Sequence, residues 1–205
     1  MTLPQAQTAP SNSPRKMTNE EFFAFVELPE NENLNFELIN GEITRMPSPS
    51  ALHGWIVTQL VVLLTLFVRP RNLGQVFGDN NDYVLTDDLV LKPDASFIAV
   101  STKIPMRLHG APDLAVEVMS PTNREGEMLE KVVAYLNYGS RLVWVIYPLE
   151  KMVQVYLPNE TGYTMRRLTI GESLSGESAL PGFTVSIADL FPPDNLFEVE
   201  EEDKN

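Results

Sequence analysis

Two short apolar runs near the middle of the chain have the pattern of core strands, yet each contains a carboxylate. The runs span Val90 to Val100 and Ala111 to Ser120, and both are rich in aliphatic residues and bounded by turn residues. Asp94 lies in the first run and Glu117 in the second. Because buried strands normally exclude acidic side chains, these two positions are the first candidates for chemistry.

Alternate residues of a strand share one face, so Asp113 and Glu117 point one way while Leu114 and Val116 point the other. Two neighbouring strands that each direct a carboxylate to the same place would form an oxygen-lined site suited to Mg²⁺ or Mn²⁺. The alternative is that such carboxylates face solvent at a sheet edge or pair with an arginine. Two acids in apolar strands, followed by a helix that carries Lys131, favour the functional interpretation.

The chain before these runs predicts a short helix and then a hairpin. Thr18 and Glu21 have capping-box spacing, and the helix is expected to end near Leu28 and to pack on the outside of the sheet. The hairpin spans residues 35–46 around an Asn-Gly turn. Glu37 lies on its first strand, facing away from the apolar neighbours, and Glu42 lies on the second. On the pattern alone, each is expected to be solvated.

Residues 51–68 are apolar almost all round, which predicts a buried helix packed on the sheet. His53 lies in its first turn, where a histidine is more often a satisfied polar group at the edge of the core than part of a site. The run from Trp55 to Val68 contains polar residues and is short for a bilayer span, so no membrane segment is expected. Arg69-Pro-Arg71 is expected to end the helix and to form a small basic spot.

The segments 74–78 and 82–85 are predicted to form one irregular strand with a bulge or turn between them. Pro93 lacks an N–H, so the strand that carries Asp94 should lie at an edge or be bulged there. The loop at 101–110 carries Lys103, Arg107 and His109; it could face a substrate or be merely solvated.

A second helix is predicted from Ser120 to about Tyr138, with Gly139 placed to end it. Lys131 and Tyr135 lie one turn apart on it. A helical lysine is usually exposed, but this one follows the Glu117 strand directly and could lean back over the carboxylates. Strands at 141–147, 152–157 and 163–168 come next, and a short strand and a helical turn within 180–191 close the domain.

Composition narrows the chemistry further. The chain of 205 residues has no cysteine and two histidines, which excludes disulfides, thiolate zinc sites and a cysteine nucleophile. Its net charge of −13 argues against a protein that simply coats nucleic acid. We expect a flexible arm at 1–16, one domain at 17–192 and an acidic tail at 193–205. No signal peptide is visible, so the protein is expected to be cytoplasmic.

The order of these motifs resembles the Uma-type family of putative restriction endonucleases, within the PD-(D/E)XK nuclease superfamily. The resemblance extends over residues 17–191. It rests on the ordered set Glu37-Leu-Ile-Asn-Gly-Glu42, His53, Pro93-Asp94, Ala111-Pro-Asp-Leu-Ala-Val-Glu-Val-Met-Ser-Pro121, Glu130-Lys131 with Tyr135, and Leu180-Pro-Gly182.

The resemblance implies an α/β (α+β) fold with a restriction-endonuclease-like core, in which helices flank a mixed β-sheet and a hairpin lies near the N-terminus. It places the acidic pair at Asp94 and Glu117, with Glu37 as an earlier acid. The usual lysine position, two residues after the glutamate, is Met119 here, and the family supplies the lysine from the following helix, at Lys131. Many relatives end the strand at 141–147 with Asp-Pro, whereas this chain has Tyr147-Pro148.

The activity implied is metal-dependent hydrolysis of phosphodiester bonds in DNA by a homodimer. Asp94, Glu117 and Glu37 would hold Mg²⁺ or Mn²⁺, and Lys131 would orient water or stabilise charge. Three further residues are candidates to support this set: His53, Asp113 and Tyr135. Two alternatives stay open, a binding or regulatory module that kept the fold without the chemistry, and a structural or assembly protein.

Overall fold

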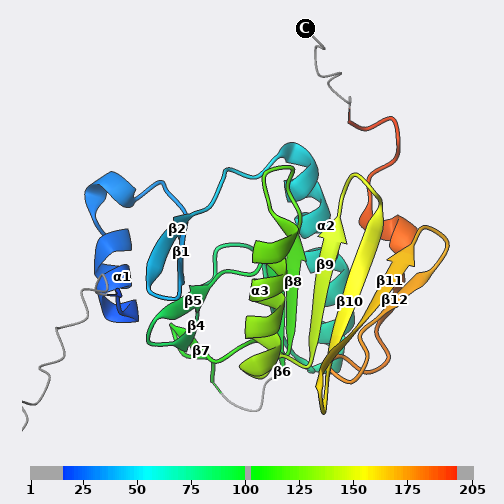
Figure 1. The fold of residues 1–205 in the computed structure, drawn as a ribbon. Coiled ribbons are helices and arrows are strands. Elements are labelled where there is room, and N and C mark those ends of the chain that lie inside the picture. Colours follow the sequence, from blue (N-terminus) through cyan, green and yellow to red (C-terminus); the bar gives the residue numbers. More distant parts are fainter. Residues whose placement is uncertain (1–15, 100–102, 198–205) are drawn as a thin grey trace, which may run out of the picture.

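A computed structural model describes residues 16–99 and 103–197 of the chain. The predicted arm, apart from Lys16, and the last eight residues of the predicted tail lie outside the described residues. Figure 1 shows two β-sheets side by side, with α1 against the smaller sheet and with α2 and α3 on the larger.

The larger sheet has six strands in the order β11-β10-β9-β8-β6-β3. Strands β8 and β9 run parallel, and the other neighbours are antiparallel, so the sheet is mixed, as predicted. The strands are β3 (Gly74–Phe77), β6 (Ala95–Ala99), β8 (Leu114–Val118), β9 (Leu142–Tyr147), β10 (Met152–Asn159) and β11 (Gly162–Thr169).

The two long helices cover opposite faces of this sheet (Figure 1). Helix α2 (Ala51–Val68) packs Ile56 and Leu60 against apolar side chains of β6, β8 and β9. Helix α3 (Glu125–Asn137) packs Met128 and Val132 against the other face of β8 and β9. A short helix η2 (Arg69–Arg71) follows α2, and β12 (Ser173–Ser175), β13 (Thr184–Ser186) and η3 (Ile187–Leu190) close the α2 side.

The smaller sheet has the order β2-β1-β5-β4-β7. Its strands are β1 (Phe36–Ile39), β2 (Glu42–Arg45), β4 (Tyr83–Thr86), β5 (Leu89–Leu91) and β7 (Leu108–His109). The predicted hairpin is confirmed: Asn40 and Gly41 adopt φ values of 53° and 77°, which the asparagine and glycine tolerate.

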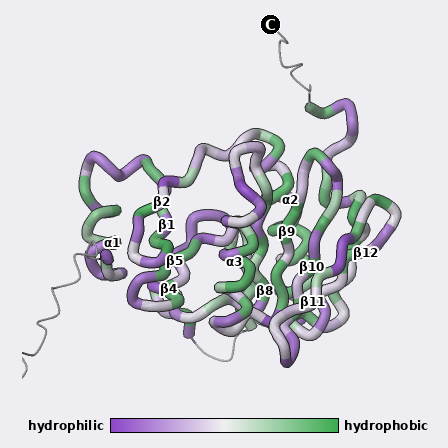
Figure 2. Tube along the Cα trace, in the orientation of Figure 1, coloured by the Kyte–Doolittle hydropathy of each residue, from purple (hydrophilic) through white to green (hydrophobic). Residues whose placement is uncertain are grey.

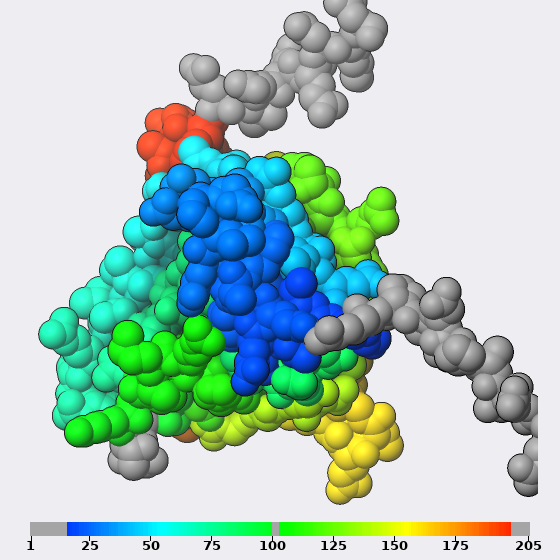
Figure 3. Space-filling view, turned by 90° about the vertical axis from the view of Figure 1, so that its left-hand side faces the viewer, coloured from blue at the N-terminus to red at the C-terminus, as the bar shows by residue number. Residues whose placement is uncertain are grey.

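Helix α1 (Asn19–Val26), followed by η1 (Pro29–Asn31), packs on the outside of the smaller sheet. The capping box is confirmed, because the Thr18 side chain accepts a hydrogen bond from Glu21 N and the Glu21 side chain accepts one from Thr18 N. Arg107 places its guanidinium 3.9 Å from the Phe23 ring centre and pairs with Glu27. The loop before β7 and α1 therefore lie side by side, as Figure 3 shows.

The run from Val90 to Val100 is not one strand, and this prediction was wrong. Its first part is β5 of the smaller sheet and its second part is β6 of the larger one, and Lys92-Pro93-Asp94 connects them. Because proline cannot continue a hydrogen-bonded ladder, the chain leaves one sheet there and enters the other. The segments 74–78 and 82–85 are likewise separate strands, β3 and β4, in different sheets.

Two helices also differ from expectation. Helix α3 begins at Glu125, after a turn, and not at Ser120. Helix α2 is not buried all round: Val62 and Leu66 are 46% and 67% exposed. Among the described residues, 51–71 are apolar and long enough to cross a membrane by length and composition alone. The same helix supplies core residues to the larger sheet, and Figure 2 shows the hydrophobic stretch packed there.

Candidate active site

The break between the two sheets brings Asp94 to Glu117. In the antiparallel pair of β6 and β8, Ala95 lies opposite Val116, and continuing this register by one residue sets Asp94 opposite Glu117. The Val118 N–H donates a 2.6 Å hydrogen bond to Asp94 Oδ2. Both side chains are buried, so the two acids from separate predicted strands meet at one place in the fold.

Glu37 reaches the same place from the smaller sheet. Alternation along β1 sends Phe36 and Leu38 towards α1 and Glu37 to the opposite side. Its Oε1 atom accepts a 2.8 Å hydrogen bond from the backbone N–H of Lys92, which lies between the two sheets. The hairpin is thereby joined to the segment that carries Asp94.

Lys131 lies over these carboxylates and not in bulk solvent. Its Nζ atom is 2.8 Å from Glu117 Oε1, 2.9 Å from Glu117 Oε2 and 3.0 Å from Glu37 Oε1, and 11% of its side chain is exposed. The ammonium therefore bridges two glutamates that belong to different sheets. Of the two orientations that the sequence allowed, solvent-exposed or directed at the carboxylates, Lys131 takes the second.

One cluster is thus formed by Asp94, Glu117, Glu37 and Lys131. Two of the three supporting candidates contact it. The Tyr135 hydroxyl, one turn beyond Lys131 on α3, donates a 2.8 Å hydrogen bond to Glu117 Oε1. His53, in the first turn of α2, has Nε2 3.2 Å from Asp94 Oδ1. The Ser50 hydroxyl caps that turn by accepting a hydrogen bond from His53 N. This bond holds the backbone from which the imidazole extends.

Asp113 lies elsewhere, at the other end of β8. It accepts hydrogen bonds from Ala99 N at 2.7 Å and from Arg141 Nε at 2.9 Å. Its carboxylate therefore joins the ends of β6 and β9, and the structure does not bring it to the cluster. Asp113 shares a strand face with Glu117, but this does not bring the two carboxylates together. Four residues of strand separate them by more than a side chain's length.

Burial and crowding perturb the cluster's protonation. Burial raises the pKa of Glu117 to about 8, and the charges of Asp94 and Glu37 add to this while Lys131 opposes it. Burial disfavours the Lys131 ammonium, but the Glu117 and Glu37 charges outweigh that effect and raise the lysine's pKa. The pKa of Tyr135 is raised well above its ordinary value, first by burial. The lysine is therefore held as a cation.

The pKa of His53 is also raised by neighbouring acids. Burial alone would lower the pKa of His53, but its hydrogen bond with Asp94 and the negative charges of Asp94 and Asp79 raise it. Burial and the Asp94 charge raise the pKa of Asp79 in turn. The histidine is thus set between two acids at the N-terminal end of α2.

Lys92 is a residue of this region that the sequence did not single out. Its side chain is buried and its ammonium lies 3.3 Å from Asp82 Oδ1, while its backbone N–H holds Glu37. The available signal was a lysine inside the apolar run Val90-Leu-Lys-Pro. A buried lysine normally needs an acidic partner, and here Asp82 on the approach to β4 supplies it.

Tyr147, at the end of β9, holds α3 from its first residue. The Tyr147 hydroxyl lies 2.9 Å from Glu125 Oε2 and 3.1 Å from Gln154 Oε1, and its single proton can be donated to either oxygen. The ring is buried. Tyr147 therefore ties the helix that carries Lys131 to two strands of the larger sheet.

The cluster lies in an open cleft of about 1330 Å³. One wall is the hairpin of β1 and β2, the opposite wall is the turn before α3 and α3 itself, and the start of α2 contributes as well. The described part of the 101–110 loop is not among the lining residues. Whatever enters the cleft meets Asp94, Glu117, Glu37 and Lys131 together.

The donor set is suited to a hard divalent cation. Carboxylates from Asp94 and Glu117 face each other across two strands, and two carboxylates with water are a common Mg²⁺ ligand set. Within residues 16–99 and 103–197, no group of three or more histidine and acidic side chains is gathered to hold a metal ion. The third predicted ligand, Glu37, faces the other carboxylates across the Lys131 ammonium.

Comparison with known proteins agrees with this architecture. A crystal structure described as a putative nuclease belonging to DUF820, from Anabaena variabilis ATCC 29413, has a TM-score of 0.71 and 25% sequence identity to the chain. The match covers 85% of this chain and 97% of that one. No curated protein matches the sequence.

The larger mixed sheet, with helices on both faces and the smaller sheet beside it, is thus a nuclease-like mixed α/β fold. Residues 20–188 match the Uma2 family, whose description is "Putative restriction endonuclease". This match takes in the hairpin, the Pro-Asp junction, β8 and α3, and so includes every element that contributes to the cluster. The chain belongs to the Uma2 family of putative restriction endonucleases.

Proposed function

We propose that the protein is a metal-dependent endonuclease that hydrolyses phosphodiester bonds in DNA. The observation that carries this proposal is the position of Lys131, whose ammonium contacts Glu117 and Glu37 beside Asp94 in an open cleft. A lysine with a purely structural role needs one acidic partner. Here three acids from both sides of the cleft gather around one ammonium. The family and the nuclease-like fold support the same reaction class.

Asp94 and Glu117 would hold Mg²⁺ or Mn²⁺, with Glu37 helping directly or through water. Such an ion lowers the pKa of a bound water and neutralises charge on the phosphate. The net charge of the cluster favours this binding, because three carboxylates face one ammonium. The Val118 N–H orients Asp94, so that ligand is positioned before any cation arrives.

Lys131 acts in this proposal as a cation and not as a base. Its pKa is raised by its two glutamate partners, so it keeps its proton at neutral pH. An ammonium held in a partly enclosed site can orient the attacking water and stabilise the charge that develops on the phosphate oxygens. Glu37 and Glu117 hold the ammonium in place, and Tyr135 holds Glu117.

A test of this function is nicking of supercoiled plasmid by the purified protein with Mg²⁺ or Mn²⁺. The wild type should nick, and Glu117→Ala should not. Glu160→Ala, which alters an exposed acid in the turn between β10 and β11 that does not line the cleft, is the matched control and should nick normally. Equal nicking by wild type and Glu117→Ala would show that the activity is a contaminant or that the site is wrong.

One observation favours a second candidate, a binding or regulatory module without chemistry. Both Glu117 oxygens already have partners, since Lys131 contacts both and Tyr135 donates to one. A site whose charges are satisfied internally has less need of a metal. Calorimetric titration with Mg²⁺ or Mn²⁺ separates the two, because carboxylate-dependent heat supports the nuclease and its absence supports the module.

The proposal includes a homodimer in the cytoplasm. Cutting both strands of a duplex commonly uses two sites related by a two-fold axis, so two copies would present two clefts. Light scattering of the protein with and without DNA measures the assembly. A monomer under both conditions would remove the dimer from the proposal and leave strand nicking as the reaction.

A further inference from the structure

The cleft is acidic, and its positive charge is scarce. Three lysine or arginine side chains line it: Arg45, Arg124 and Lys131. Lys131 is engaged by two glutamates. The acids that line the cleft are more numerous: Glu37, Glu42, Asp79, Asp94, Glu117, Glu127 and Glu130. A DNA backbone entering this cleft therefore depends on the remaining cations to hold its phosphates.

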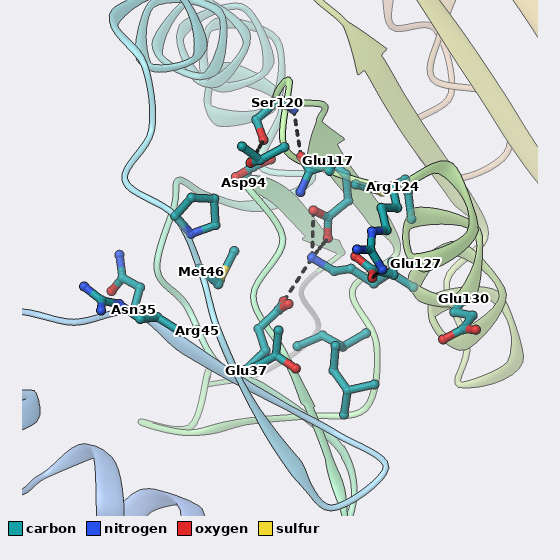
Figure 4. A pocket seen from close by; sticks show the side chains of 18 of the residues that line it. Asn35, Glu37, Arg45, Met46, Asp94, Glu117, Ser120, Arg124, Glu127 and Glu130 are labelled. Atoms are coloured by element: carbon teal, nitrogen blue, oxygen red, sulfur yellow. Dashed lines mark hydrogen bonds and ion pairs between the residues drawn. The ribbon is translucent and has the colours of Figure 1, made fainter.

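Arg45 and Arg124, the arginine pair, lie on opposite walls. Arg45 ends β2 on the hairpin wall, and Arg124 is the N-cap residue of α3 on the facing wall. Figure 4 shows them on either side of the Asp94 and Glu117 carboxylates. Both arginines are exposed, so a ligand in the cleft can reach them without displacing core side chains.

The ion pair between Arg124 and Glu127 is easily exchanged. The arginine Nη1 atom lies 3.6 Å from Glu127 Oε1, and the two side chains are 83% and 66% exposed. Exposed pairs of this kind contribute little stability. A phosphate, which offers an arginine two parallel charge-assisted hydrogen bonds, can replace the glutamate. Ser120 and Thr122 line the same wall and carry hydroxyls that suit phosphate oxygens.

We infer that Arg45 and Arg124 grip the backbone phosphates on the two sides of the scissile bond, one from each wall of the cleft. The inference rests on the proposed function and adds to it the residues that position the DNA. Phosphate contacts set register and orientation but do not read the bases. The arginine pair should therefore contribute equally to binding of any duplex sequence.

The inference is tested by fluorescence anisotropy with the full chain and a short labelled duplex in Ca²⁺, with gels to check that the duplex stays intact. Salt is varied from about 50 to about 200 mM, because removing one arginine that binds a phosphate reduces the slope of log affinity against log salt by about 1. Arg45→Ala and Arg124→Ala should each weaken binding about tenfold, the effect of removing one charge-assisted hydrogen bond. The lysine variants at both positions should restore part of the affinity.

Two further variants sharpen the test. Arg167→Ala removes an exposed arginine on β11, which is not among the cleft's lining residues, and should change neither affinity nor slope. Glu127→Gln frees Arg124 from its carboxylate partner and should strengthen binding about threefold, a gain of the size of an exposed ion pair. The gain should shrink when Glu127→Gln is combined with Arg124→Ala, which separates the release of Arg124 from the simple loss of an acid in the cleft.

The outcomes separate the two proposals. If the wild type binds duplex DNA and nicks plasmid but both arginine variants keep its affinity and salt slope, the arginine pair is wrong and the nuclease stands. If Arg167→Ala weakens binding as much as the cleft variants, the DNA contacts are diffuse and the pair is again wrong. If the wild type neither binds duplex nor nicks plasmid, both the pair and the proposed function fall.

Discussion

Lys131 and Glu117 meet at 2.8 Å between Nζ and Oε1, although one is carried by α3 and the other by β8 on the sheet beneath it. The parallel step from β8 to β9 makes this contact possible, because α3 is the crossover that returns the chain across one face of the sheet. A lysine on the inward face of that crossover necessarily overlies the strand it follows. The helix therefore supplies an ammonium that the strand itself, with Met119 in the usual place, does not.

The first prediction concerns Lys131→Met. Removing the ammonium should lower plasmid nicking at least about 100-fold, the effect of losing one group that stabilises transition-state charge. It should also leave three carboxylates without their cation, so affinity for Mg²⁺ in calorimetry should rise, not fall. Lys131→Arg keeps the positive charge. It is the matched control that shows how much of each effect comes from losing that charge.

The opposite result for Mg²⁺ would be informative. If Lys131→Met abolishes cation binding together with activity, the lysine organises the carboxylates more than it competes with a cation. Thermal unfolding of both variants in chelator shows whether the fold survives, and retained helical circular dichroism is required before the activities are compared.

The second prediction concerns His53→Gln and the orientation of Asp94. The histidine contacts Asp94 Oδ1 at 3.2 Å, and residues that support a metal ligand typically change affinity or activity by about 10- to 100-fold. We expect a loss of that size in Mg²⁺ affinity and in nicking rate. Thr58→Ala, an exposed change on the same helix, should leave both unchanged.

The third prediction is that Tyr135→Phe weakens the fold more than the chemistry. The hydroxyl donates to Glu117 Oε1 in a fully buried position, and losing one hydrogen bond to a charged group costs about 1.5–3 kcal/mol. Denaturant unfolding at a pH above the raised pKa of Glu117, where its carboxylate is ionised, measures this loss. Glu117 keeps both contacts with Lys131, so nicking should fall less than in Lys131→Met; a larger loss would give the hydroxyl a direct part in the reaction.

The fourth prediction is that the metal-free protein loses stability as pH rises. The pKa of Glu117 is raised from an ordinary 4.5 to about 8 in the folded state. A raised folded-state pKa contributes stability that is fully present below the unfolded value and lost as pH rises through the folded one. Unfolding free energy in chelator should therefore decline between about pH 4.5 and about pH 8.

A divalent cation should oppose this decline, because it binds the ionised carboxylate and stabilises the folded state by mass action. Glu117→Gln, which cannot ionise, should flatten the pH dependence and weaken the stabilisation by Mg²⁺. A chelator-treated protein whose stability does not decline over the same pH range would show that Glu117 is ionised throughout, held so by Lys131.

Much of the fold could be predicted from patterns of neighbouring residues. The capping box at Thr18, the hairpin at Asn40-Gly41 and the long α2 helix follow from signals within a few residues, and each was predicted correctly. Such signals reflect backbone hydrogen bonding and turn sterics, which neighbours in sequence satisfy among themselves. The acidic positions Asp94 and Glu117 could be selected for a similar reason, since carboxylates in apolar strands are locally anomalous, whereas Glu37 was selected only through the family resemblance.

Sequence alone determined which residues were available for chemistry, and the family resemblance supplied their order; tertiary structure decided which of them meet. Val90 to Val100 looked like one strand because local apolarity cannot tell which sheet a strand joins, and Pro93 in fact divides it between two sheets. Asp113 and Tyr135 were equal candidates on paper, yet only Tyr135 reaches Glu117. Sheet pairing and helix packing are long-range choices, made by the burial of whole faces.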